Sequence, residues 1–204
     1  MTLRGRLISL FPAYHILSAG AALLALIFTR DWLFLPVLIF AVYIQPVLLF
    51  RLHNVFCPLK EGRSDLSKKQ YNSWWASYQF QLLFMSFPFL EAILHFFPGL
   101  FSFWLRCWGS KIGKGVNWNP RVEITDRSLV EVGDYSAFGH SVILISHVVN
   151  KGKSCNYLLY VKKVNIGSGA LIGAGTQAGP GVCIESGAKV PVSQQLYINQ
   201  KVAA

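Results

Sequence analysis

Two histidines, His140 and His147, are the residues of this 204-residue chain best suited to move a proton near neutral pH. The pKa of an imidazole lies in that range, which is what a general base needs. His147 ends a regular series of repeats and precedes an interruption at residues 149–165, so we expect it on a rigid support beside a longer loop. His140 lies seven residues earlier, just over one repeat, and is expected to stack with His147 and to orient it or bind a substrate. The alternative for both is a solvated histidine at a corner of the fold.

Several other polar residues could take part in the same chemistry. The candidates for orienting His147 are Asn150, Asp134 and Glu131. The possible nucleophiles are Ser141, Ser146 and Cys155, but none has the spacing to a base and an orienting residue that nucleophilic catalysis uses. Developing negative charge is usually held by backbone N–H groups, which the glycine-rich corner at Gly173 and Gly175 could supply. Lys162 and Lys163, at the end of the interruption, are expected to attract a phosphate-bearing substrate.

The elements that position these residues are predicted by a six-residue repeat, clearest between Ile166 and Val190. One phase of the repeat is aliphatic (Ile166, Ile172, Ala178, Ile184, Val190), and the position four residues later is always small (Ala170, Thr176, Val182, Ala188). A helix would need apolar spacing of three and four residues and few glycines, and a disordered linker would not keep an aliphatic residue at every sixth position. The pattern is typical of a parallel β-helix with three short strands per coil.

The same repeat begins at Ile112, with two departures from its period. The phase slips by two residues at Val130-Glu131, and residues 149–165 leave the pattern as a predicted loop. Long loops on rigid scaffolds often carry function. The repeats make between three and four coils, a short prism whose sides leave much surface to cover, and we therefore expect a trimer.

The first fifty residues are predicted to cross a membrane twice. Leu7–Phe28 and Trp32–Phe50 are almost wholly apolar, and 22 residues of helix span about 33 Å. A cleaved signal peptide is the alternative, but a second apolar stretch follows at once. The basic residues flanking the two stretches are Arg4, Arg6, Arg51, Lys60, Arg63, Lys68 and Lys69. This distribution predicts a helical hairpin with both termini in the cytoplasm. His15, near one end, is expected to have a structural role at the membrane surface.

Residues 71–108 contain 14 aromatic side chains and are interrupted by Pro88 and Pro98-Gly99. Tryptophan and tyrosine favour the membrane–water boundary, so we predict two or three helices lying in the cytoplasmic interface. The alternative is a helical layer packed on the β-helix. Glu91 and His95 are four residues apart on one helical face, and are expected to pair with one another.

Composition restricts the classes of protein. The chain has 53% hydrophobic residues and a net charge of +10. No basic stripe with a nucleic-acid-binding motif is present, so the charge is better explained by the flanks of membrane segments. The cysteines, Cys57, Cys107, Cys155 and Cys183, have no C-x-x-C spacing, which predicts free thiols rather than a zinc site or disulfides.

The predicted fold is therefore a membrane α + β protein in four parts. Residues 1–50 form a transmembrane helical hairpin, 51–111 an aromatic-rich interfacial helical region, 112–192 a hexapeptide-repeat β-helix, and 193–204 a C-terminal tail.

Residues 112–192 resemble the hexapeptide-repeat acyltransferases. The resemblance is carried by VGDYSAFGHSVILISH (Val132–His147), by the interruption after it and by VNIGSGALIGAGTQAGPGV (Val164–Val182). It implies a left-handed β-helix, His147 as the catalytic base, and a homotrimer with sites between subunits. It also implies an acyl-CoA or acyl carrier thioester as donor, with Lys201 in the tail near that co-substrate. The N-terminal residues point to a membrane-attached branch of the family.

The sequence leaves three functions open. The first is transfer of an acyl group to a hydroxyl or amine of a lipid-like acceptor, by a multi-pass protein of the inner membrane with its β-helix in the cytoplasm. The second is a non-catalytic membrane scaffold. The third is a carbonic-anhydrase-like metal enzyme, which needs three histidine ligands where the β-helix offers only His140 and His147. We therefore expect no metal.

Overall fold

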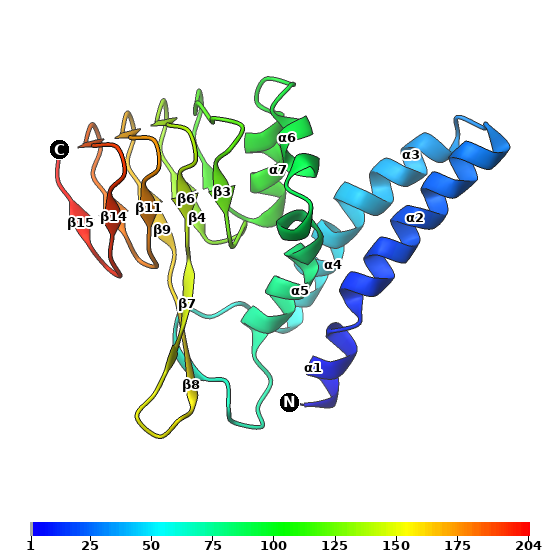
Figure 1. The fold of residues 1–204 in the computed structure, drawn as a ribbon, viewed down its shortest axis with the longest axis horizontal. Helices are drawn as coiled ribbons and strands as arrows, with labels where there is room; N and C mark the ends of the chain where they lie inside the picture. Colours follow the sequence, from blue (N-terminus) through cyan, green and yellow to red (C-terminus); the bar gives the residue numbers. More distant parts are fainter. Residues whose placement is uncertain (1) are drawn as a thin grey trace. The chain divides into compact units, whose positions relative to one another are not determined.

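The computed structural model describes residues 2–204, which form two compact units. The first unit holds residues 2–60 and 68–87 and is helical. The second holds residues 61–67 and 88–204 and contains two further helices and the strands (Figure 1). The predicted boundaries at 50 and 111 differ from this division, because the aromatic-rich region contributes helices to both units.

The first unit is built from long apolar helices. Its elements are α1 (Leu3–Ile8), α2 (Phe11–Thr29), α3 (Phe34–Ile39), the π-helical turn η1 (Phe40–Ile44), α4 (Gln45–Phe56) and α5 (Ser73–Ser86). Two stretches, Leu3–Thr29 and Phe34–Phe56, are long and apolar enough to cross a membrane. Core helices of soluble proteins and signal sequences can have the same length and composition, so this finding alone does not place the chain in a membrane. It does confirm helices at both predicted stretches.

A small polar cluster joins the two long helical stretches. Gln45 donates a hydrogen bond from Nε2 to the hydroxyl of Tyr14 (2.8 Å), and Ser18 donates to Oε1 of Gln45 (3.2 Å). His15 is fully buried, with Nε2 3.2 Å from the carbonyl oxygen of Val42. The ring of His15 is therefore part of the contact between the helices, which agrees with the expected structural role, whereas its position at a membrane surface stays a prediction. Polar groups in apolar helices are tolerated when a neighbouring helix provides their partners.

The second unit begins with two short helices, α6 (Phe89–Leu94) and α7 (Leu100–Trp108). In Figure 1 they cover the end of the stack of coils at which the repeats begin. Phe101, Trp104 and Trp108 are buried, whereas Phe96 and Phe103 are exposed. One face of these helices therefore packs on the β-helix, as in the second interpretation of this region, and exposed aromatic side chains lie on the other.

The repeats form three parallel sheets, and the chain passes through them in turn. The first sheet contains β2 (Lys111–Ile112), β4 (Val130–Val132), β9 (Val164–Ile166), β12 (Cys183–Ile184) and β15 (Lys201–Val202). The second contains β5 (Ala137–Phe138), β10 (Leu171–Ile172) and β13 (Lys189–Val190). The third contains β3 (Glu123–Ile124), β6 (Ile143–Leu144), β11 (Gln177–Ala178) and β14 (Gln195–Leu196).

Burial in these sheets follows the six-residue pattern. The aliphatic phase from Ile166 to Val190 is buried, and so are the small residues four positions later. The predicted core of the coils is confirmed. The predicted end of the coil at residue 192 is wrong, because β14 and β15 continue the third and first sheets through Val202. Polar residues occupy most of this last coil, which weakens the repeat in the sequence.

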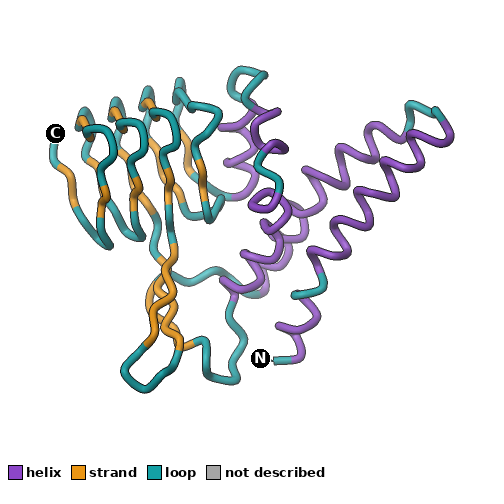
Figure 2. The backbone as a smooth tube through the Cα atoms, viewed as in Figure 1, coloured by secondary structure: helices purple, strands orange, loops and turns teal. Residues whose placement is uncertain are grey.

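The predicted loop at 149–165 is instead an antiparallel hairpin of β7 (His147–Lys151) and β8 (Tyr157–Val161). A third strand, β1 (Gly62–Asp65), pairs with β8. Figure 2 shows this small sheet projecting from the side of the coils. The segment next to His147 is therefore a β-hairpin and not the predicted loop.

Candidate functional site

Both departures from the six-residue period fall at the same corner of the coil. From Ile124 to the next in-phase residue, Val132, the chain uses eight residues instead of six, and between Leu144 and Val164 it inserts the hairpin. The parallel register pairs Ile124 with Leu144, so these two corners lie on neighbouring coils. The hydrogen bonds that join them include Thr125 N to Leu144 O (3.1 Å) and Ser146 Oγ to Leu129 O (3.0 Å).

Asp126 and His147 meet at this corner. Nδ1 of His147 lies 2.6 Å from Oδ2 of Asp126, and the side chain of Asp126 is fully buried. Thr125 donates a second hydrogen bond to the same carboxylate oxygen (3.0 Å). A carboxylate accepting from Nδ1–H fixes the ring orientation and makes Nε2 the basic nitrogen of the neutral imidazole. His147 keeps 18% of its side-chain surface exposed, so a small group can reach it.

The next residue, Arg127, ties this corner to helix α6. Its side chain is buried, and its guanidinium donates to both carboxylate oxygens of Glu91, with Nε 2.8 Å from Oε1. The guanidinium also lies over the ring of Trp104, 5.8 Å from its centroid. The expected pairing of Glu91 with His95 is therefore wrong. Helix α6 ends at Leu94, and the ring of His95 stacks on Phe101 instead.

Two of the predicted orienting residues, Glu131 and Asp134, have hydrogen-bond partners elsewhere on the coils. Glu131 binds Lys163 (2.9 Å) and Lys111 (3.2 Å), and hydrogen bonding from Lys163 is the main reason why the pKa of Glu131 is lowered. Asp134 accepts from the backbone of Lys114 (2.7 Å). Sequence reasoning missed Asp126, although the slip of two residues makes the first full coil 20 residues long. Counting back one such coil from His147 reaches Arg127, the neighbour of Asp126.

His140 lies at a different corner from His147. It occupies the turn between β5 and β6, where its carbonyl oxygen accepts from Gly175 N (2.8 Å). Residues stack in this fold when they are about one coil of three strands apart, whereas a separation of seven moves the chain to the next corner. The expected stacking of His140 on His147 is therefore wrong.

The glycine-rich corner does not offer the predicted anion site through Gly173 and Gly175. Their N–H groups donate to Val190 O (2.9 Å) and His140 O (2.8 Å), so both are used to join neighbouring coils. A side chain at Gly173 would collide with the backbone of Pro191, only 2.5 Å from the Cβ position. Close packing between coils explains this glycine.

The three predicted lysines occupy separate positions. Nζ of Lys162 donates a hydrogen bond to the amide oxygen of Asn199 (2.8 Å). Because this amide is neutral, the contact does not neutralise the positive charge of Lys162. Lys163 forms ion pairs with Glu131 and, at 4.0 Å, with Glu61. Lys201 is exposed on the last strand, β15. Lys162 lies immediately after the hairpin that starts at His147, and it is the lysine best placed to serve that corner.

Two of the candidate nucleophiles, Ser146 and Cys155, lie in surroundings that do not suit nucleophilic catalysis. Ser146 is buried and donates to a backbone carbonyl, and Cys155 lies exposed in the hairpin turn. Among residues 2–204 no group of three or more His, Cys, Asp or Glu side chains could hold a metal ion.

The solved structures that this chain resembles include two acetyltransferases. No protein-family model matches the sequence, and no curated protein matches it significantly. A hexapeptide-repeat acetyltransferase from Vibrio cholerae, solved with acetyl coenzyme A, is 19% identical with a TM-score of 0.36 over 47% of this chain and 56% of its own. Serine acetyltransferase isoform 3 from Entamoeba histolytica, solved with cysteine, is 11% identical with a TM-score of 0.27 over 81% and 73%. This chain thus spans little more than half of the first protein. Because both TM-scores lie below 0.5, neither likeness carries an assignment of activity.

Proposed function

We propose that this chain is a membrane-attached acyltransferase in which His147 is the general base and Asp126 holds its ring. The observation that carries the proposal is the 2.6 Å contact between Nδ1 of His147 and the buried carboxylate of Asp126. It sits where the sequence resembles the catalytic stretch of hexapeptide-repeat acyltransferases, and left-handed winding of the coil is part of the same proposal.

The reaction follows from this pair. An acceptor hydroxyl or amine attacks the thioester carbonyl, and Nε2 of His147 takes its proton as the new bond to carbon forms. The carboxylate of Asp126 stabilises the imidazolium that results. When the carbon–sulfur bond breaks, the imidazolium returns the proton to the leaving thiolate. The donor is acyl-CoA or an acyl carrier thioester, with Lys162 and the exposed Lys201 as candidate contacts for its phosphates.

Membrane attachment is supported by the two apolar helical stretches. In the most apolar part of Leu3–Thr29 only 17% of the residues are buried, and in that part of Phe34–Phe56 only 28% are. Most residues of a core helix would be buried. With basic residues at Arg4, Arg6 and after Phe50, the proposed topology places the β-helix in the cytoplasm. Cysteine labelling of intact cells at positions 29 and 201 tests it, in a background with the four native cysteines replaced. Labelling at 201 from outside would overturn this topology.

A homotrimer is part of the proposal. The coils are few and their sides are open, with Leu171 on the outer face of the second sheet 48% exposed. Association would cover such faces and bring the corner of one subunit next to the coils of another. Light scattering in detergent should give three chains per particle, and a fully active monomer would contradict this part.

The enzymatic proposal is tested by label transfer. Purified protein in phosphatidylcholine nanodiscs receives acyl-CoA labelled in the acyl group, together with a lipid extract from its native membrane. We expect label in the lipid fraction, with one free thiol released per acyl group transferred. Thiol release without labelled lipid or amine would show thioester hydrolysis and overturn the transfer reaction.

A further inference from the structure

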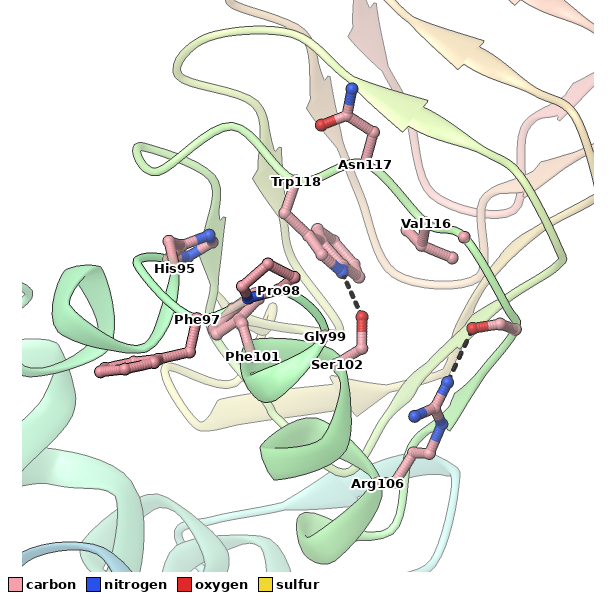
Figure 3. A pocket seen from close by; sticks show the side chains of 12 residues that line it. His95, Phe97, Pro98, Gly99, Phe101, Ser102, Arg106, Val116, Asn117 and Trp118 are labelled. Carbon is pink, nitrogen blue, oxygen red and sulfur yellow. Dashed lines mark hydrogen bonds between the residues drawn. The ribbon is translucent and has the colours of Figure 1, made fainter.

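A cavity of about 410 Å³ lies in the second unit, between the segment that joins α6 to α7, helix α7 itself and the first coil (Figure 3). Ligand-binding cavities commonly have volumes of about 300–1,000 Å³. Six residues that define its two ends are His95, Phe97, Phe101, Trp118, Arg106 and Asn117. Neither Asp126 nor His147 lines this cavity, so the cavity is distinct from the contact between those two residues.

One end of the cavity is aromatic. His95 stacks on Phe101 with ring centroids 4.2 Å apart, and the edge of Trp118 faces Phe101 at 5.4 Å. Burial lowers the pKa of His95, which favours the uncharged form of its ring in this wall. An apolar chain or ring can pack here without burying a charge.

The other end carries Arg106, the charged residue among the described residues that line the cavity. Its Nε donates to Ile112 O (2.8 Å) and its Nη2 to Gly113 O (2.7 Å), as Figure 3 shows for the second bond. These two bonds to backbone carbonyls hold the guanidinium in place at this end of the cavity. A fixed guanidinium is well suited to bind a phosphate or carboxylate.

Large aromatic side chains of α6, α7 and the segment between them are exposed, and one of them, Phe97, lines the cavity. The exposed fractions are 81% for Phe96, 61% for Phe97, 60% for Phe89 and 58% for Phe103. Four exposed phenylalanines on and between two short helices are typical of a surface that contacts lipid. A chain leaving the cavity past Phe97 would remain in an apolar surrounding.

We propose that this cavity binds an amphiphile with an anionic head at Arg106 and its apolar chain along Phe101 and Trp118 toward Phe97. Glu91 of helix α6 holds Arg127, the residue next to Asp126, so the segment that leads into the cavity is tied to the corner of His147. The amphiphile is thus a candidate for the acyl acceptor, and in this respect the inference rests on the proposed function.

Photocrosslinking tests the binding site without requiring catalysis. The full chain in phosphatidylcholine nanodiscs is irradiated with a diazirine-bearing dodecyl phosphate, and labelled peptides are identified by mass spectrometry. We expect label in residues 95–102 and 113–118. Unlabelled dodecyl phosphate should compete at least about tenfold better than dodecanol. Dodecanoate as a third competitor separates the two sources of an anionic head, because a phosphate preference indicates a phospholipid-like ligand and a carboxylate preference a fatty acid.

Two variants sharpen the test. Val116→Trp fills the cavity and should reduce labelling at least about tenfold, whereas the matched control Val192→Trp, in an exposed turn outside the cavity, should not. Arg106→Gln should remove the advantage of dodecyl phosphate over dodecanol. Labelling mapped elsewhere on the wild-type chain, or equal competition by dodecanol, would overturn the inference whether or not the variants fold. His147→Ala should keep the labelling, so a failure of the catalytic proposal is distinguishable from a failure of this one.

Discussion

The carboxylate of Asp126 gives the sharpest prediction about the candidate site. Asp126→Asn keeps the size of a fully buried side chain but removes the charge 2.6 Å from Nδ1 of His147. A hydrogen bond to a charged group contributes about 1.5–3 kcal/mol. Because the imidazole becomes positive only during proton transfer, this loss falls on the transition state. It corresponds to a decrease of about tenfold to 150-fold in kcat. If the NH₂ group of the new amide side chain faced Nδ1, the ring proton would move to Nε2 and the decrease would be larger.

The assay is acyl transfer at saturating donor, with kcat and KM determined separately. Glu131→Gln is the matched control, since it also removes one negative charge from the coils but from a carboxylate that binds lysines. We expect it to stay within about threefold of the wild type. The reasoning would be refuted if Asp126→Asn retained the wild-type kcat, or if it changed only the donor KM while the protein remained folded.

Three further predictions concern packing, pH and the donor. Gly133→Ala should destabilise the fold by about 1–3 kcal/mol in urea unfolding, because its Cβ would lie 2.4 Å from Ser168 N. Gly169→Ala has φ +67° and nothing within 4 Å of the new Cβ, so we expect only about 1 kcal/mol, and an equal or larger loss there would contradict the steric account. Glu131 has a lowered pKa in the folded state, so its contribution, about 1 kcal/mol or less, is present above the ordinary carboxyl pKa and is lost as the pH falls through the folded value. The stability difference between wild type and Glu131→Gln should therefore vanish in acid, and a difference that persisted there would contradict it. Lys162→Ala should raise the KM for the donor about three- to tenfold and weaken the salt dependence of that KM. Lys163 is paired with Glu131, so Lys163→Ala should change the donor KM less. A larger effect of Lys163→Ala than of Lys162→Ala would reject Lys162 as a donor contact.

The fold could be predicted largely from periodicity. A buried residue at every sixth position requires a three-sided coil, and the residues from Ile166 to Val190 are buried as that pattern demands. The last coil was harder to predict, because Gln195 and Lys201 lie on the outer face of its strands and its core is reduced to residues such as Leu196. These residues belong to the sheets because their strands pair with those of the preceding coil. The local sequence does not encode this pairing.

The candidate site was predicted in part. His147 could be selected because it ends an unbroken series of repeats. Its partner could not be selected by sequence distance, since Asp126 is 21 residues away and reaches His147 only through the register of β3 on β6. His140 was overvalued for the converse reason, because nearness in sequence places residues at different corners of a coil. Glu91 shows the same limit, as its partner Arg127 is 36 residues away.

The most direct test of the catalytic claim is the rate of acyl transfer by His147→Ala. Removing a general base typically costs about 10²–10⁴ in rate. We predict that His147→Ala folds and binds the thioester donor with unchanged affinity but transfers acyl groups at least about a hundredfold more slowly. His140→Ala, altered at another corner, should remain within about threefold of the wild type. Turnover by His147→Ala close to the wild-type rate would contradict the assignment of His147 as the base.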